Sequence, residues 1–201
     1  MKVVAIHSSN RPTGLTASLA QSVLAGAAAA GAESEIIHLC AHKISPCRMC
    51  PPGGWGQCRQ EKDCIIEDDD FQAIRAKLHA ADGIVFATPV YFWDISELGK
   101  IFLDRLRRAE WPRREASLLK GKPVIGIACA GGSGTGSPPA IVNVERYMTY
   151  LQLQHVVYLP VSRQNKDLQL KAAHAAGAFM VERFLTSPEA TAPNATPTRL
   201  S

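Results

Sequence analysis

Residues 81–105 read ADGIVFATPVYFWDISELGKIFLDR, and this stretch decides the fold class of the chain. Residues 83–87 form an unbroken apolar run, which predicts a strand buried on both faces of a sheet. Residues 95–108 carry apolar side chains at a helical spacing, so we expect a helix with one face packed on that sheet. A buried strand followed by a loop and an amphipathic helix is the repeating unit of a parallel α/β sheet.

The same unit recurs on both sides of this stretch. Five apolar strands are expected, at residues 2–6, 35–39, 83–87, 124–128 and 155–159. Helices are expected at residues 15–30, 70–80, 95–108, 140–151 and 167–185. This alternation predicts a doubly wound parallel sheet with helices on both faces. We expect one domain over residues 1–185, with a Cys-rich insertion at 40–66 and a disordered tail rich in Thr, Pro and Ala at 186–201.

The composition suits one globular domain, because 46% of the 201 residues are hydrophobic and 20% are charged. A net charge of +4 is too small to indicate nucleic-acid binding, and no long apolar run predicts a membrane span.

A strand precedes the Ala-rich stretch at residues 15–32, which argues against a signal peptide and predicts a cytoplasmic protein with reduced cysteines. The most basic segment, residues 105–122, is either a solvated surface or a patch for an acidic partner or a pyridine nucleotide.

Ligands of doubly wound sheets bind beyond the carboxyl ends of the strands, so the loops after the first, third and fourth strands form the candidate site. The first loop has hydroxyls, an arginine and a glycine leading into a helix, without a Walker or Gly-x-Gly-x-x-Gly pattern. Free backbone N–H groups and the helix dipole favour a terminal phosphate there, and ordinary helix capping is the alternative. The candidate phosphate-binding residues are Ser9, Asn10, Arg11, Thr13, Gly14, Leu15 and Thr16.

The second and third loops are candidates for holding a flat ring system. The second loop consists of Thr88, Pro89, Val90, Tyr91, Phe92 and Trp93. Its three consecutive aromatics favour stacking, and a hydrophobic plug or an oligomer contact is the alternative. The third loop contains Ala130, Gly131, Gly132 and Ser133. Glycine lets the backbone approach a ligand closely and present N–H groups, and a flexible surface loop is the alternative.

Four cysteines lie within 18 residues, in the spacing Cys47-x2-Cys50-x7-Cys58-x5-Cys64. Such density in a cytosolic protein indicates metal or redox chemistry rather than structural disulfides. Four thiolates suit an iron–sulfur cluster or a zinc ion, and reduced thiols or a redox disulfide are the third interpretation. The isolated thiols at positions 40 and 129 are expected in the core. No paired histidine motif or Ser-His-Asp arrangement is present, which fits a cofactor that supplies its own chemistry and leaves catalytic residues unassigned.

Together, these loops resemble the NADPH-dependent FMN reductase and iron–sulfur flavoprotein families of the flavodoxin-like superfamily. The resemblance covers about residues 2–185 and is most specific at Ala-Asp-Gly, Thr-Pro-Val-Tyr-Phe and Lys-x-Phe-x-Asp-Arg within residues 81–105. Ser9, Arg11, Gly14 and Thr16 are similar to the family's phosphate loop, and Gly121-Lys122-Pro123 is also familiar. Leu15 replaces the usual Asn or Ser, and residues 51–57 lengthen the usual spacing between the cysteines.

The resemblance implies a five-stranded sheet of order 2-1-3-4-5 and a homodimer or homotetramer. FMN would have its phosphate in the first loop and its isoalloxazine between the second and third loops. The implied activity passes electrons from NADPH or NADH through FMN to a small-molecule acceptor such as a flavin or quinone. The alternative is an iron–sulfur flavoprotein with a 4Fe-4S cluster and a ferredoxin-like partner. A hypothesis of another class is a non-catalytic phosphate-ligand-binding protein with a zinc-stapled loop.

Overall fold

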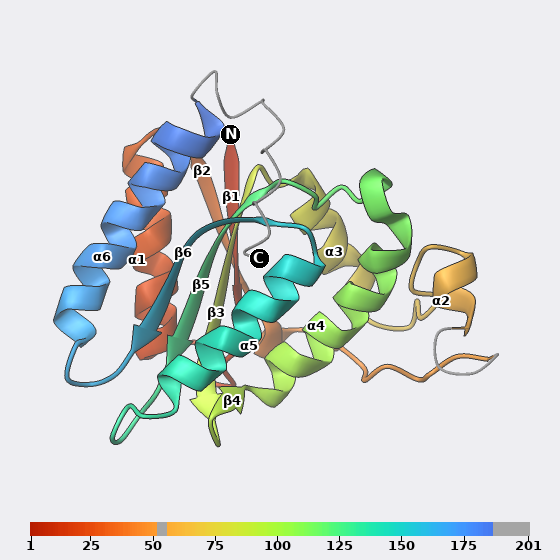
Figure 1. Ribbon diagram of the computed structural model, residues 1–201, viewed down its shortest axis with the longest axis horizontal. Helices are drawn as coiled ribbons and strands as arrows, with labels where there is room; N and C mark the ends of the chain where they lie inside the picture. Colours follow the sequence, from red (N-terminus) through yellow and green to blue (C-terminus); the bar gives the residue numbers. More distant parts are fainter. Residues whose placement is uncertain (52–55, 187–201) are drawn as a thin grey trace, which may run out of the picture.

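A parallel sheet with helices on both faces forms the centre of the computed structural model, which describes residues 1–51 and 56–186 (Figure 1). Its parallel strands are β1 (Lys2–His7), β2 (Glu33–His38), β3 (Gly83–Tyr91), β5 (Pro123–Cys129) and β6 (Gln154–Val161). They lie in the order β2-β1-β3-β5-β6. The α/β flavodoxin-like fold is therefore confirmed. The predicted tail falls outside the described residues from position 187 onward.

The predicted count of five strands is wrong, because a sixth strand, β4 (Asp94–Ile95), pairs antiparallel with the end of β3. β3 continues beyond the predicted apolar run to Tyr91 and turns back through Phe92 and Trp93. The sheet order in chain numbering is consequently 2-1-3-5-6 rather than 2-1-3-4-5. Helix α4 (Glu97–Glu110) then begins two residues later than predicted, where the Ser96 hydroxyl accepts a hydrogen bond from the Gly99 N–H at 3.2 Å.

Two groups of helices cover the two faces of the sheet (Figure 1). Helices α1 (Leu15–Ala29) and α6 (Lys166–Phe179) pack on one face, and a short π-helix, η3 (Met180–Leu185), extends α6. Helices α3 (Phe71–Ala80), α4 and α5 (Ser137–Tyr150) pack on the other. Smaller elements are the 3-10 helices η1 (Leu39–Ala41) and η2 (Trp111–Ala116) and the short helix α2 (Gly56–Gln60). Each face therefore has its own hydrophobic core, as expected when all strands are buried on both sides.

Helices α1 and α6 approach each other closely through two glycines. A Cβ atom at Gly26 would collide with the carbonyl of His174, and one at Gly177 would collide with the carbonyl of Val23. Glycine is required at both positions because any side chain would push the two backbones apart.

Lys122, one of the residues that carry the family resemblance, has a structural role. Its ammonium donates hydrogen bonds to the carbonyls of Leu78 at 3.2 Å and His79 at 2.6 Å, and also to that of Ala81. These carbonyls lie at the C-terminal end of α3, where helical carbonyls lack partners and a cation is favourable. Lys122 therefore anchors the end of α3 beside β5.

A buried ion-pair network joins α3 to the end of α4. The Arg75 guanidinium, 2% exposed, donates through Nε to Glu110 Oε1 at 2.6 Å. His79 Nε2 lies 2.7 Å from the same oxygen, and the Ser117 hydroxyl donates to Glu110 Oε2. Burial alone would raise the pKa of Glu110, but these partners outweigh it and lower the pKa to about 2. Glu110 is therefore held as a buried carboxylate.

Among residues 1–51 and 56–186, none of the helices combines the length and apolar character that a membrane crossing requires.

Candidate functional site

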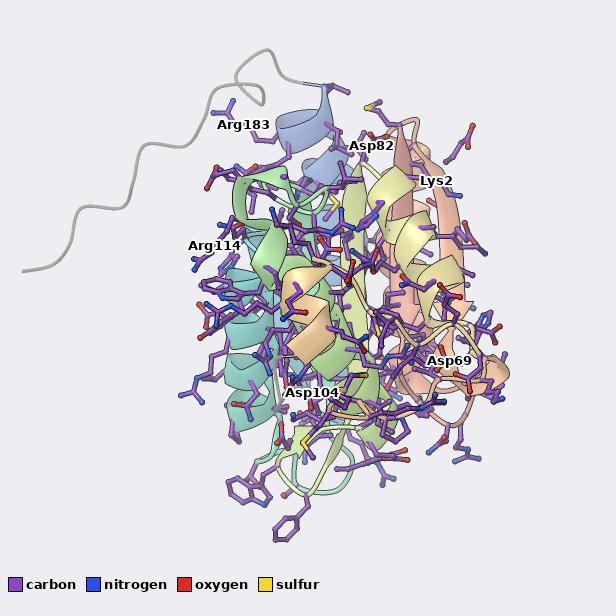
Figure 2. All side chains as sticks on the ribbon, turned by 90° about the vertical axis from the view of Figure 1, so that its right-hand side faces the viewer. Lys2, Asp69, Asp82, Asp104, Arg114 and Arg183 are labelled. Atoms are coloured by element: carbon purple, nitrogen blue, oxygen red, sulfur yellow. The ribbon has the colours of Figure 1, made fainter. Side chains whose placement is uncertain are left out.

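The loops after β1, β3 and β5 gather at the carboxyl edge of the sheet, at the bottom of Figure 1. Hydrogen bonds join the first two of these loops directly. The Ser8 N–H donates to the Ala87 carbonyl at 2.9 Å, and the Ser96 hydroxyl donates to the Ser8 carbonyl at 2.7 Å. At the opposite edge, the Lys2 N–H donates to Asp82 at 2.7 Å, and Figure 2 shows both residues at that end. The candidate site is therefore built on a rigid sheet edge.

The first loop leaves the start of α1 open for a ligand. The residue that caps α1 is Gly14, with φ 131°, and no side chain makes a capping hydrogen bond. A Cβ at Gly14 would have nothing within 4 Å. Ser9 instead accepts a hydrogen bond from the Arg11 N–H at 3.1 Å, which shapes the loop. Capping by Ser or Thr therefore does not account for this loop, and the start of α1 borders open space at Gly14.

The other first-loop residues divide between exposed and buried positions. Asn10, Arg11 and Thr13 are exposed, and the Asn10 amide donates to Glu97 on α4. Thr16 is 7% exposed, and its side chain hydrogen-bonds the Cys129 thiol. Arg11 is consequently the first-loop cation that is accessible to an anion at the start of α1.

A hollow of about 520 Å³ adjoins the first loop on the α6 side, and we call it the phosphate hollow. Gly14 lines it from the first loop and Ser18 from α1, whereas Arg163 lines it from the loop before α6, and Lys166 and the carboxylate Asp167 line it from the first turn of α6. Sequence reasoning missed both cations, because it did not consider the loop after the last strand. The available signal was two basic residues, Arg163 and Lys166, in the segment that follows the last predicted parallel strand at residues 155–159.

The second loop divides into a buried anchor and an exposed tip. Thr88 is buried, and its hydroxyl accepts a hydrogen bond from the Ser96 N–H at 3.1 Å. Phe92 and Trp93 have φ values of 45° and 70° and form the two-residue turn between β3 and β4. Their side chains are 96% and 56% exposed, and Tyr91 is 41% exposed. The three aromatics are therefore not a plug in this chain's own core and present ring surface outward.

The third loop packs against the second on one side and is open on the other. A Cβ at Gly136 would lie 2.9 Å from Val90 Cγ1 and 3.4 Å from the Cα of Trp93, so glycine permits this contact. Gly131 and Gly132 have nothing within 4 Å of a built Cβ. The backbone at those two residues can therefore approach a ligand lying beside the second loop.

His7 ends β1 next to the first loop but lies in the core. It is fully buried, its Nδ1 is 3.0 Å from His38 Nδ1, and its Nε2 has no hydrogen-bond partner among the described residues. Burial, and then the neighbouring His38, lowers the pKa of His7 to about 4. His7 is therefore neutral at physiological pH.

The structure brings the four clustered cysteines to one place. Cys47, Cys50, Cys58 and Cys64 line a single hollow with Ile65, Ile66, Arg105 and Arg108, which we call the cysteine hollow. Its free volume of about 20 Å³ suits one water-sized group, so a four-iron cluster would need the loop to move outward. No group of three or more His, Cys, Asp or Glu within the described residues has the arrangement of a metal-ion site. The observation that bears on metal or cluster binding is therefore that four thiols line the same hollow.

Arg105 connects this hollow to the fold. It is 1% exposed, its guanidinium bonds Asp69 and lies 3.4 Å from Cys64 Sγ, and it covers the Phe71 ring at 4.2 Å. Burial alone would raise the pKa of Asp69, but hydrogen bonds from Arg105 and the Ser45 N–H lower it.

The two isolated cysteines differ from each other. Cys129 is buried as expected, and burial raises the pKa of its thiol to about 12. Cys40 is exposed, so its predicted core position is wrong. β2 ends at His38, and in the following η1 turn Leu39 takes the core position instead. The insertion between the cysteines lies outside the described residues at 52–55.

Comparisons with known proteins agree with this geometry. The model of the NADPH-dependent FMN reductase family matches residues 1–157, and the chain belongs to that family. An iron–sulfur flavoprotein of Methanocaldococcus jannaschii is 36% identical over 143 residues, covering 71% of this chain and 68% of the relative. The chain is therefore an oxidoreductase of the flavodoxin-like class.

Solved structures support the same fold. RosB with bound 8-demethyl-8-formylriboflavin-5'-phosphate matches with a TM-score of 0.70 and 14% identity, covering 95% of this chain and 82% of RosB. The NAD(P)H:quinone oxidoreductase from Methanothermobacter marburgensis matches with a TM-score of 0.66 and 13% identity, covering 90% of this chain and 96% of that protein.

Proposed function

We propose that this chain binds FMN and passes electrons from NADPH or NADH to a small-molecule acceptor such as a flavin or quinone. The observation that carries the proposal is the start of α1, which has a glycine cap, no side-chain capping bond and open space around it. A terminal phosphate is the group that such a helix start accepts. When bound, FMN supplies the hydride and electron chemistry, and the protein supplies binding and orientation.

Different loops would hold the phosphate and the ring of FMN. The phosphate would be held by the first loop, namely Ser9, Asn10, Arg11, Thr13, Gly14, Leu15 and Thr16. Arg163 and Lys166, which line the phosphate hollow together with the carboxylate Asp167, would add a net positive charge there. The ring would lie between residues 88–93 and 130–133, where Gly131 and Gly132 leave open backbone. The exposed Phe92 and Trp93 suit a homodimer or homotetramer in which a second copy covers the ring.

The test is to purify the protein, record its absorbance spectrum, and identify the released cofactor by mass spectrometry. The expected result is a yellow protein that releases FMN and oxidises NADPH or NADH when a quinone is added. Recovery of FAD as the main species would refute the phosphate-loop argument, because the first loop lacks a pyrophosphate pattern. A colourless protein that binds phosphate without turnover would favour the non-catalytic hypothesis.

A second proposal concerns the four cysteines. We propose that Cys47, Cys50, Cys58 and Cys64 hold an iron–sulfur cluster, which would let the chain exchange electrons with a ferredoxin-like partner. The support for this is that the four thiols line one hollow and that the Arg105 guanidinium lies beside Cys64, where it would offset part of the charge of four thiolates; the loop would have to move outward to admit the cluster.

Anaerobic purification followed by iron, sulfide and zinc assays tests this second proposal. Wild-type protein should contain iron and sulfide, and Cys50→Ser should lose most of both while keeping its flavin. Zinc in place of iron, or neither metal after anaerobic reconstitution, would refute the cluster and leave a flavin reductase.

A further inference from the structure

A buried cluster of hydroxyl groups lies where the first and second loops meet the start of α4. It consists of Ser8, which follows β1, Thr88, near the end of β3, and Ser96, directly before α4, and each of them is 0% exposed. Ser8 leads into the first loop, and Thr88 begins the second. The cluster therefore joins, inside the protein, the two loops that would hold the phosphate and the ring of FMN.

Ser96 is the centre of this cluster, because its polar groups contact three different segments. Its hydroxyl donates a hydrogen bond to the Ser8 carbonyl at 2.7 Å and lies 2.9 Å from Ser8 Oγ. Its backbone N–H donates to Thr88 Oγ1 at 3.1 Å. The Ser96 hydroxyl also accepts from the Gly99 N–H at 3.2 Å, in the first turn of α4. One residue thus connects the first loop, the second loop and α4.

The Ser8 carbonyl depends on this donor because the chain leaves the sheet at that point. The ladders that β1 forms with β2 and β3 both end at His7. A buried carbonyl that loses its donor costs more free energy than an ordinary hydrogen bond contributes. A further link from the first loop to α4, between the Asn10 amide and Glu97 at 2.5 Å, is exposed to solvent. Hydrogen bonds are stronger away from water, so the buried link through Ser96 is the one that fixes the first loop.

Close packing at Gly99 reinforces the connection. A Cβ atom at Gly99 would lie 2.9 Å from Ser8 Oγ, 2.8 Å from Ile95 Cγ2 and 3.2 Å from Phe86 Cζ. Because a packed interior yields little, the first loop cannot shift relative to the second without moving α4 or the core beside β3. The spacing between the two loops is therefore set by the interior of the protein.

We propose that Ser96 is a positioning residue that makes this site prefer FMN over riboflavin, by holding the first and second loops at one fixed spacing. The inference rests on the proposed binding of FMN. A single ribityl chain joins the phosphate and the ring of FMN, so the ligand engages both loops only when their separation matches its length. Fixed loops let the second contact form without further ordering of the protein. Riboflavin has the same ring and chain but lacks the phosphate, so its affinity does not depend on that spacing.

Fluorescence titrations with FMN and with riboflavin, on the full chain after its flavin has been removed, test the proposal. Ser96→Ala should raise the FMN dissociation constant about tenfold and change the riboflavin constant by less than about twofold. Ser96→Thr keeps the hydroxyl and should retain the wild-type preference for FMN.

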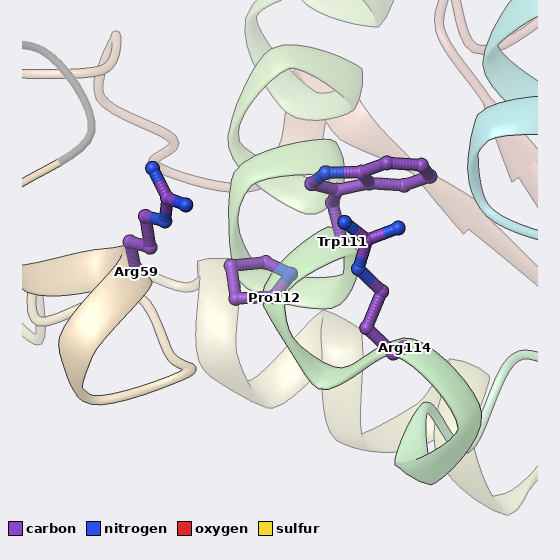
Figure 3. A pocket seen from close by; sticks show the side chains of 4 residues that line it. All are labelled: Arg59, Trp111, Pro112 and Arg114. Carbon is purple, nitrogen blue, oxygen red and sulfur yellow. The ribbon is translucent and has the colours of Figure 1, made fainter.

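Ser117→Ala is the matched control, because Ser117 is a serine of 8% exposure whose hydroxyl also donates within a buried network, to Glu110. It follows η2, which lines a separate hollow of about 430 Å³ beside α2 (Figure 3). This variant should lower the melting temperature and leave both flavin constants unchanged.

Thermal melts show whether each variant is folded. A folded Ser96→Ala protein with the wild-type preference for FMN would overturn the proposal, and so would an equal loss of affinity for both flavins, because general loosening of the site acts on both. If Ser96→Ala does not fold, Gly99→Ala gives the same test, since its Cβ would press on Ser8 Oγ, and an unchanged preference there would also overturn the proposal. Wild-type protein that binds neither flavin would instead refute the proposed function.

Discussion

Replacing Glu110 with Gln should destabilise the protein by about 3 kcal/mol at pH 7. The pKa of Glu110 is lowered from 4.5 to about 2, because the bonds from His79, Ser117 and Arg75 outweigh the cost of burial. A depression of that size corresponds to about 3 kcal/mol of stability in favour of the ionised form. The variant would also leave Arg75, which is 2% exposed, with the partly exposed Asp63 as its remaining carboxylate partner.

The pH dependence of this effect follows from the direction of the shift. A lowered pKa contributes stability that is fully present above pH 4.5 and is lost as the pH falls towards about 2. The difference in unfolding free energy between wild type and Glu110→Gln should therefore be largest near pH 7 and should shrink between about pH 4.5 and pH 2. A carboxylate outside this network with a lowered pKa, such as Asp69, titrates in both proteins and cancels in the difference.

Urea unfolding followed by circular dichroism, at pH 7, 5 and 3, measures this difference. Glu115→Gln is the matched control, because it makes the same chemical change at a side chain that is 77% exposed. The control should change stability by less than about 0.5 kcal/mol. A loss below about 1 kcal/mol for Glu110→Gln at pH 7, or a loss that stays constant down to pH 3, would refute the reasoning.

Three further predictions concern the site and the helix packing. Arg11→Ala should raise the FMN dissociation constant about tenfold or more in a fluorescence titration, since a charge-assisted hydrogen bond is lost. Arg105→Met should cost about 3–5 kcal/mol in urea unfolding, because Asp69 would be left as a buried unpaired charge, and it should lower the bound iron. Gly177→Ala should lower the melting temperature by several degrees, because its Cβ would collide with the Val23 carbonyl and push α1 away from α6.

Each of these predictions has a control. Lys171→Ala should leave FMN affinity unchanged, whereas an unchanged affinity in Arg11→Ala would exclude Arg11 from the site. Arg146→Met removes an exposed arginine and should cost little stability. If Arg146→Met lost as much unfolding free energy as Arg105→Met, the loss in Arg105→Met could not be attributed to its buried ion pair with Asp69. Gly131→Ala should keep the wild-type melting temperature, because nothing lies within 4 Å of its Cβ. A Gly177→Ala protein that melts with wild type would disprove the predicted collision.

The sequence alone was sufficient for the layered fold and for the edge of the sheet at which the candidate site lies. The strands at residues 83–87 and 124–128 were predictable because apolar runs bounded by turn residues are local signals. Parallel strands bring their carboxyl ends to one edge, so naming the three loops required no coordinates. The four cysteines were also visible as a chemically dense segment.

Tertiary structure decided the features that depend on residues far apart in the chain. The turn at Phe92 and Trp93 has positive φ values without the usual Asn or Gly, so no local signal indicated β4 or the outward position of the aromatics. The phosphate hollow combines Gly14 with Arg163, and the buried network combines Arg75 with Glu110. Local periodicity reports which residues are buried, whereas the pairing of distant charges and the shape of a hollow arise only when the helices pack on the sheet.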